Sequence, residues 1–183
     1  MFQPFVVPRF VDVDRGRRVA PYERVFDDLE IGLSSGQADI RVAQSLKNSF
    51  LVSPPDHHYT LDVSVGDIAD TEWITLEFML EPDKVFEAGR VTVLVSLAAS
   101  TERVFGVDLR LVRGDDNLED LHLGKVEPSR EEKFVSQNLS RPLDGFLDRL
   151  EEMPKAAKVL LFAPVEPNFK LSLAMLNVHY SGR

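Results

Sequence analysis

The stretch Trp73-Ile74-Thr75-Leu76-Glu77-Phe78-Met79-Leu80 decides the fold class, because its apolar positions alternate with a second set of residues. Ile74, Leu76, Phe78 and Leu80 form one apolar side, and Trp73, Thr75, Glu77 and Met79 form the other side. Successive side chains of a β-strand point to opposite faces, whereas an amphipathic helix repeats its apolar residues every three or four positions. The stretch therefore predicts a strand with one buried and one wetter face.

The same alternation continues on both sides of this stretch. It is found in four further segments, at Tyr59–Val65, Val91–Leu97, Phe105–Leu111 and Phe169–Met175. The apolar rows of 91–97 and 105–111 stay aligned only in one register, which predicts that these two strands form a hairpin. Asp39–Val42 is a further candidate strand, and Val159–Ala163 is apolar on both sides, as expected of a fully buried strand.

Departures from this pattern predict the remaining features. After Phe169–Met175 the apolar set changes phase, so we expect a β-bulge near Met175–Leu176. Helical spacing of apolar residues predicts a short helix over Tyr22–Leu29 and a better one over Leu143–Met153, ended by Pro154. The charged stretch 114–130 is expected to be mostly loop, with a short strand around Leu121 and Leu123.

Many strands and at most two helices predict an all-β protein, an antiparallel β-sandwich of jelly-roll type with one or two short helices. We expect residues 1–183 to form a single domain. Within it, 1–55 is expected to be an irregular N-terminal extension that packs on a β-sandwich core formed by 56–183.

Composition excludes several function classes. The 183 residues contain no cysteine, which rules out disulfides, thiol nucleophiles and Cys-ligated zinc. Their formal charge is −9. The acidic balance disfavours nucleic acid and anionic membranes as partners. No phosphate loop and no G-x-S-x-G motif is present, which disfavours nucleotide-dependent enzymes and α/β-hydrolases. We expect no cofactor. The N-terminal residues do not read as a signal peptide, which predicts a soluble cytoplasmic protein.

Trp73 is the most informative aromatic residue, because strand parity places it on the wetter face beside Glu77. An exposed tryptophan on a sheet can stack on a sugar ring, and Asp108 and Arg110 can supply hydrogen bonds if their strand lies close. We therefore take Trp73, Glu77, Asp108 and Arg110 as the candidate ligand-binding site. The alternative is that Trp73 only begins its strand and is covered by the N-terminal extension.

Metal binding is a second hypothesis. Asp56-His57-His58 offers hard ligands, and His122 or His179 could complete a site of the double-stranded β-helix type. Adjacent histidines on a strand point to opposite faces, so the alternative is a polar strand entrance after Pro54-Pro55. A cluster of oxygen-bearing side chains is formed by Asp115, Asp116, Asn117 and Glu119. It is expected either to bind calcium or to be a plain acidic loop. The metal ligands, if any, stay unknown at this stage.

The strand run from Trp73 to Tyr180, closed by Val159–Phe162 and Phe169–Tyr180, resembles the β-sandwich (jelly-roll) accessory modules common in carbohydrate-active proteins. The resemblance implies a non-catalytic binding or accessory role directed at carbohydrate. Two alternatives stay open: a metal-dependent cupin-like enzyme, and a protein–protein interaction module. In the latter, the apolar segment Phe2–Val13 would add a strand to another subunit and create a homo-oligomer.

Overall fold

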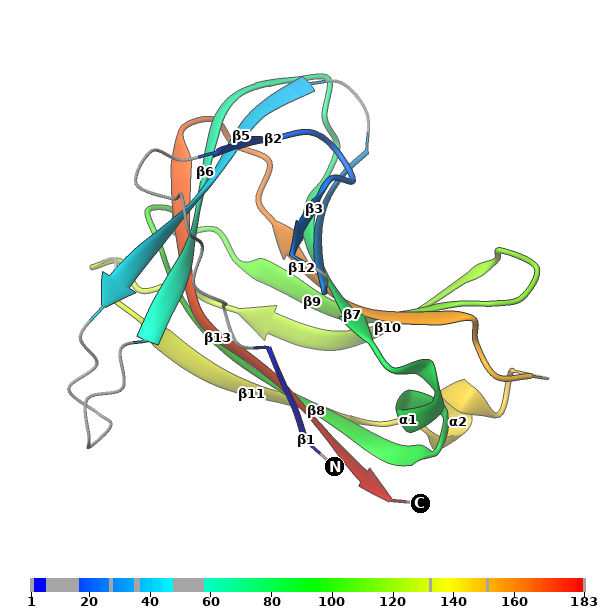
Figure 1. The fold of residues 1–183 in the computed structure, drawn as a ribbon. Helices are drawn as coiled ribbons and strands as arrows, with labels where there is room; N and C mark the ends of the chain where they lie inside the picture. Colours follow the sequence, from blue (N-terminus) through cyan, green and yellow to red (C-terminus); the bar gives the residue numbers. More distant parts are fainter. Residues whose placement is uncertain are drawn as a thin grey trace.

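The computed structural model describes residues 2–5, 17–26, 28–34, 37–47, 58–131, 133–150 and 152–182. They form two antiparallel sheets packed face to face, with two short helices, α1 (Pro82–Phe86) and α2 (Asp144–Leu147), together at one end (Figure 1). This architecture confirms the predicted all-β antiparallel sandwich. No helix within the described ranges is long and apolar enough to cross a membrane.

The seven-stranded sheet has the order β11-β8-β13-β6-β5-β2, and β1 pairs with β13 beside this path. Its members are β1 (Phe2–Phe5), β2 (Arg17–Val19), β5 (Gln37–Lys47), β6 (His58–Ala69), β8 (Ala88–Ala99), β11 (Val135–Pro142) and β13 (Phe169–Gly182). The six-stranded sheet has the order β10-β9-β12-β7-β4-β3. Its members are β3 (Arg24–Phe26), β4 (Leu29–Leu33), β7 (Ile74–Leu80), β9 (Phe105–Val112), β10 (Leu118–Val126) and β12 (Ala156–Ala163).

From β6 onward the chain passes repeatedly between the two sheets, and only β9 and β10 are consecutive strands of one sheet. The predicted apolar rows at 74–80, 91–97 and 105–111 point into the space between the sheets, whereas Met175 of the last predicted row is exposed. The inward residues of β8 and β9 are fully buried: Val91, Val93, Val95, Leu97, Phe105, Val107, Leu109 and Leu111. Each such side chain stabilises the fold by roughly 1.5–3 kcal/mol relative to exposure. Alternating burial along the strands is therefore what holds the two layers together.

The predicted hairpin between 91–97 and 105–111 is wrong. β8 lies between β11 and β13 in one sheet, whereas β9 lies between β10 and β12 in the other. Two apolar rows meet equally well across the core and along one sheet face, so matched parity does not identify a hydrogen-bonded partner. The hairpin partner of β9 is β10, which occupies much of the stretch expected to be loop.

Parts of the stretch 1–55 are regular, contrary to expectation. β2 and β5 are members of the seven-stranded sheet, and β3 and β4 are members of the six-stranded sheet. The predicted helix over Tyr22–Leu29 is wrong, because β3 and β4 pair there as antiparallel strands. The predicted strand Asp39–Val42 lies within β5. The division into one domain with an extension stays a prediction.

Two further predictions concern the C-terminal half. The register of β13 against β8 shifts between Leu173 and Met175, which confirms a bulge beside the predicted position. On the other side of β13, the residues up to Leu173 pair with β6 and those from Leu176 pair with β1. The helix predicted over Leu143–Met153 is only the single turn α2, followed by further turn structure.

Candidate functional site

The outer surface of the six-stranded sheet carries charged side chains from every one of its strands. Most of them lie next to buried residues on the same strand, as Asp108 does between Val107 and Leu109. We call this surface the polar face, and its charged members are Arg24, Glu30, Glu77, Asp108, Arg110, Asp120, His122 and Lys158.

Lys158 of β12 joins the two carboxylates of the polar face that lie on β4 and β7. Its Nζ is 2.8 Å from Glu77 Oε2 and 3.4 Å from Glu30 Oε2. Glu77 is only 3% exposed, and its second oxygen accepts a hydrogen bond of 2.9 Å from the Thr75 hydroxyl. Arg24 Nε lies 3.3 Å from Glu30 Oε1 and extends the network to the edge strand. A buried carboxylate is thereby given both a countercharge and hydrogen bonds.

Two cross-strand pairs occupy the other half of the polar face. The Arg110 guanidinium donates two hydrogen bonds to Asp120, from Nε at 2.8 Å and from Nη2 at 2.7 Å. This bonding holds the pKa of Arg110 above its usual value. In the neighbouring pair, His122 Nδ1 lies 2.7 Å from Asp108 Oδ1. Bidentate and cross-strand pairing holds these side chains in defined positions before any ligand binds.

Tyr22 projects over the polar face from the turn between β2 and β3. The turn is closed by a hydrogen bond of 3.1 Å from the Glu23 amide to the Ala20 carbonyl, and Tyr22 has a φ of 59°. Burial raises the pKa of Tyr22, the charge of Glu77 raises it further, and the charges of Arg110 and Lys158 oppose the shift. Tyr22 nevertheless stays 53% exposed as a residue. A non-glycine residue held at positive φ while exposing an aromatic ring is a candidate binding residue.

Two more aromatic residues lie near one end of the polar face. Phe162 of β12 is half-buried, pairs in register with Thr75 on β7, and packs over Gly106. Trp73 lies two residues before Thr75 and is half-buried, and its amide donates a hydrogen bond of 3.3 Å to the Ser34 hydroxyl. If the alternation of β7 extends to Trp73, this residue is the diagonal neighbour of Phe162.

The four residues predicted from the sequence therefore relate to the polar face as follows. Glu77, Asp108 and Arg110 all lie on it, although β12 separates their strands. Glu77 and Asp108 both pair with Leu160, one from each side, so about 10 Å separates their strands. Trp73 lies four residues before Glu77, or about 13 Å along the strand. Tyr22 and Phe162 were missed, the former because its spacing to Val25, Phe26 and Leu29 is helical.

The structure describes only some of the residues in the metal hypothesis. His57 lies outside the described residues, and so does the side chain of His58. His122 and His179 belong to different sheets. Among the described residues there is no group of three or more His, Cys, Asp or Glu suited to a metal ion. The metal-dependent enzyme stays an untested prediction.

The acidic loop predicted as a calcium alternative is internally bonded. The Asp115 carboxylate accepts hydrogen bonds from the Asn117 backbone amide at 3.1 Å and from its side-chain amide at 2.8 Å. These two bonds hold the pKa of Asp115 below its usual value. Asp116 forms an ion pair with Lys155, and Arg113 Nη1 lies 3.7 Å from Glu119. The carboxylates of this loop therefore each have a protein partner.

Comparison with known proteins places the fold but not the family. No protein family profile matches the chain, and no curated protein does. Among solved structures, the CBM22-1 xylan-binding domain of Paenibacillus barcinonensis aligns over 94% of this chain and 96% of its own, with a TM-score of 0.54 and 8% identity.

Two further solved structures show the same fold. A family 11 carbohydrate-binding module from a cellulosomal cellulase of Clostridium thermocellum covers 92% of this chain and 95% of its own, with a TM-score of 0.51 and 8% identity. The enzymatically active domain of bacteriophage CBA120 tailspike protein 4 matches 82% of this chain with 19% of its own, at a TM-score of 0.52 and 8% identity. The chain thus has the β-sandwich fold found in carbohydrate-binding modules, which confirms the fold-level resemblance seen in its sequence.

Proposed function

We propose that this protein is a non-catalytic carbohydrate-binding β-sandwich and that the polar face is its binding site. The observation that carries the proposal is Tyr22, an exposed aromatic ring held at positive φ above a sheet of mutually paired charged side chains. Similarity in fold to two carbohydrate-binding modules over nearly the whole length of each chain supports it.

The chemistry of the polar face suits a sugar. Pyranose rings offer an apolar C–H face, which stacks on aromatic side chains, and hydroxyls, which both donate and accept hydrogen bonds. Tyr22, Phe162 and Trp73 supply the aromatic surfaces. Arg110 and Asp108, which are partly exposed, supply donors and acceptors already oriented by their partners.

We assign Glu77 to positioning rather than to ligand contact, because it is buried beneath the surface and holds Lys158. The same pairing supports a binding role over a catalytic one. A glycosidase needs a carboxylic acid and a second carboxyl group that face the scissile bond. Here Glu77 and Glu30 share one ammonium group, so neither carboxylate faces an open cleft with its charge unmatched.

The test starts from an array of immobilised glycans and continues with calorimetry on soluble oligosaccharides that score as positive. We expect Tyr22→Ala and Trp73→Ala each to weaken binding about tenfold, the loss of one stacking contact. Met153→Ala removes an apolar side chain that is equally exposed but lies outside the polar face, and it serves as the matched control.

Two results would count against the site. If the wild-type protein binds no glycan on the array, the proposed function is wrong. If the wild type binds but Tyr22→Ala and Trp73→Ala bind as tightly as Met153→Ala, the sugar is held elsewhere. Thermal melting of each variant shows whether a loss of binding reflects unfolding, which we do not expect for Tyr22 because it lies in an exposed turn.

A further inference from the structure

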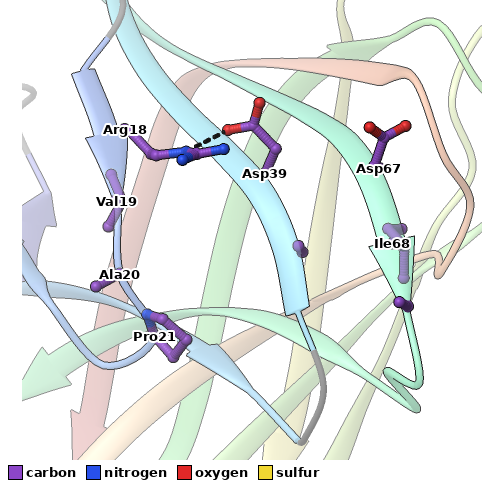
Figure 2. Close-up of a pocket in the computed structure, with 9 residues that line it drawn as sticks. Arg18, Val19, Ala20, Pro21, Asp39, Asp67 and Ile68 are labelled. Carbon is purple, nitrogen blue, oxygen red and sulfur yellow. Dashed lines mark hydrogen bonds and ion pairs between the residues drawn. The ribbon is translucent and has the colours of Figure 1, made fainter.

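A groove lies at the edge of the seven-stranded sheet, formed by β2, β5 and β6, with a volume of about 530 Å³. Figure 2 shows the side chains of Arg18, Asp39 and Asp67 at one end of the groove, and those of Pro21 and Ile68 nearer the other. The groove is lined among others by Arg18, Pro21, Asp39, Asp67, Ile68 and Ala69. It contains none of the charged residues of the polar face.

An irregularity in the sheet creates the polar end of the groove. The register between β5 and β6 passes from Ala38↔Ile68 to Ile40↔Val65, so β6 holds one more residue than β5 there. Without this bulge, Asp67 would follow the parity of the buried Val65 and point into the core. With it, Asp67 is exposed, and Ile68 packs against the core instead.

The remaining charges at this end are arranged around Asp39. Arg18 Nε donates to Asp39 Oδ1 at 2.8 Å, and Arg41 Nη2 approaches Asp39 Oδ2 at 3.3 Å. Gly66, the residue before Asp67, lets β6 come close, because a Cβ there would lie 3.3 Å from the Asp39 Cβ. Asp39 is thus a fixed acceptor flanked by the donors of Arg18, while Asp67 is a second acceptor on the neighbouring strand.

We propose that this groove is a second saccharide site that holds one neutral pyranose unit. The inference rests on the proposed carbohydrate-binding function but concerns a different sheet and different residues. The carboxylates accept hydrogen bonds from sugar hydroxyls and the guanidinium of Arg18 donates to them, while Pro21 and Ile68 offer an apolar surface to the ring. Arg18 and Arg41 offset the charge of Asp39, which favours an uncharged ligand over a strongly ionic one.

The experiment follows backbone amide shifts by NMR while soluble neutral oligosaccharides of xylose, glucose, mannose or galactose are added. We expect Gly66, Asp67 and Ala69 to shift as one set, separately from polar-face amides such as those of Leu160 and His122. Asp67→Ala is expected to lower the affinity of the groove for the sugar about tenfold, the effect of losing one hydrogen bond to a charged group. Asp148→Ala is the control, because it removes an exposed carboxylate from the turn after α2.

The outcomes separate this inference from the proposed function. Shifts confined to the polar face overturn the groove and leave the proposed function standing. Shifts confined to the groove, whose affinity falls about tenfold in Asp67→Ala and is kept in Tyr22→Ala, support the groove and overturn the polar face as the site. No shift with any neutral sugar overturns both. A groove response to glucosamine but to no neutral sugar makes it a cation site, and the inference is then wrong.

Discussion

Replacing Lys158 by methionine removes the only charge that the structure places beside both Glu77 and Glu30 among the described residues. Methionine keeps most of the aliphatic stem, so the packing against the sheet changes little. The buried carboxylate of Glu77 is then left with the Thr75 hydroxyl as its hydrogen-bond donor, at 2.9 Å. An ionised group that is buried without a countercharge strongly destabilises the folded state.

The size of the effect follows from burial. Glu77 is 3% exposed and Lys158 18%, so solvent screens this pair little. Breaking a buried ion pair from one side costs about 3–5 kcal/mol, and the retained Thr75 bond favours the lower end, about 3 kcal/mol. For a chain of 183 residues this corresponds to a fall in Tm of about 6–12 °C.

The assay is urea unfolding followed by circular dichroism, with two companion variants. Arg103→Met breaks a pair of similar length, 3.1 Å to Glu166, but from a side chain that is 67% exposed, and it should cost less than about 1 kcal/mol. Adding Glu77→Gln to Lys158→Met should recover part of the loss, because the unmatched charge is removed. Equal costs for Lys158→Met and Arg103→Met, or no recovery in the double variant, would refute the reasoning.

Three further predictions rest on single contacts. Gly32→Ala should destabilise the protein by about 1–3 kcal/mol in urea unfolding, because the new Cβ would overlap Glu77 Oε1. Gly124→Ala should cost a similar amount, because Gly124 lies at the bulge of β10 with a φ of 153°, whereas a neutral result would mean that the bulge relaxes freely. The hydrogen bond from Arg18 lowers the pKa of Asp39, so its stabilising contribution is complete at neutral pH and is lost as pH falls through that lowered pKa. In an NMR titration, Arg18→Ala should raise the pKa of Asp39, and an unchanged value would contradict this pairing.

Much of the fold could be predicted because a strand buried on one face must alternate its side chains. The rows at 74–80, 91–97 and 105–111 lie on the predicted faces, with their apolar members buried. The bulge in β13 was also visible, since a change of phase in an otherwise regular row requires an extra residue.

Strand partners could not be predicted, because alternation specifies a face and not a neighbour. β8 and β9 belong to different sheets but turn their apolar rows into the same core, where the requirement on these rows is the same as in a hairpin. β11 could not be predicted because its sequence shows almost no alternation. It is an edge strand whose sequence, Val135-Ser-Gln-Asn-Leu-Ser-Arg-Pro142, has only Leu139 fully turned to the core.

The candidate site was predicted in part. Strand parity correctly grouped Glu77, Asp108 and Arg110 on one type of face, because each lies between inward apolar residues. The pattern alone does not single out Tyr22, because its helical spacing predicts a helix where Pro21-Tyr22 is the centre of a turn. Proline suits the second position of a β-turn, and the positive φ of Tyr22 at the third position is incompatible with a helix.

The pairing of charges on the polar face bears on which sugars the proposed site would hold. The chain carries a formal charge of −9, yet on this face Lys158 faces Glu77 and Glu30, and Arg110 faces Asp120. Charges that are already matched act on a ligand mainly as oriented hydrogen-bonding groups, because their net field is small. Such a surface gains little from a charge on the sugar and much from hydroxyls at the right spacing. Binding to it should therefore weaken only slightly between low and high salt, whereas a steep salt dependence would mean that unpaired charges elsewhere on the protein hold the ligand.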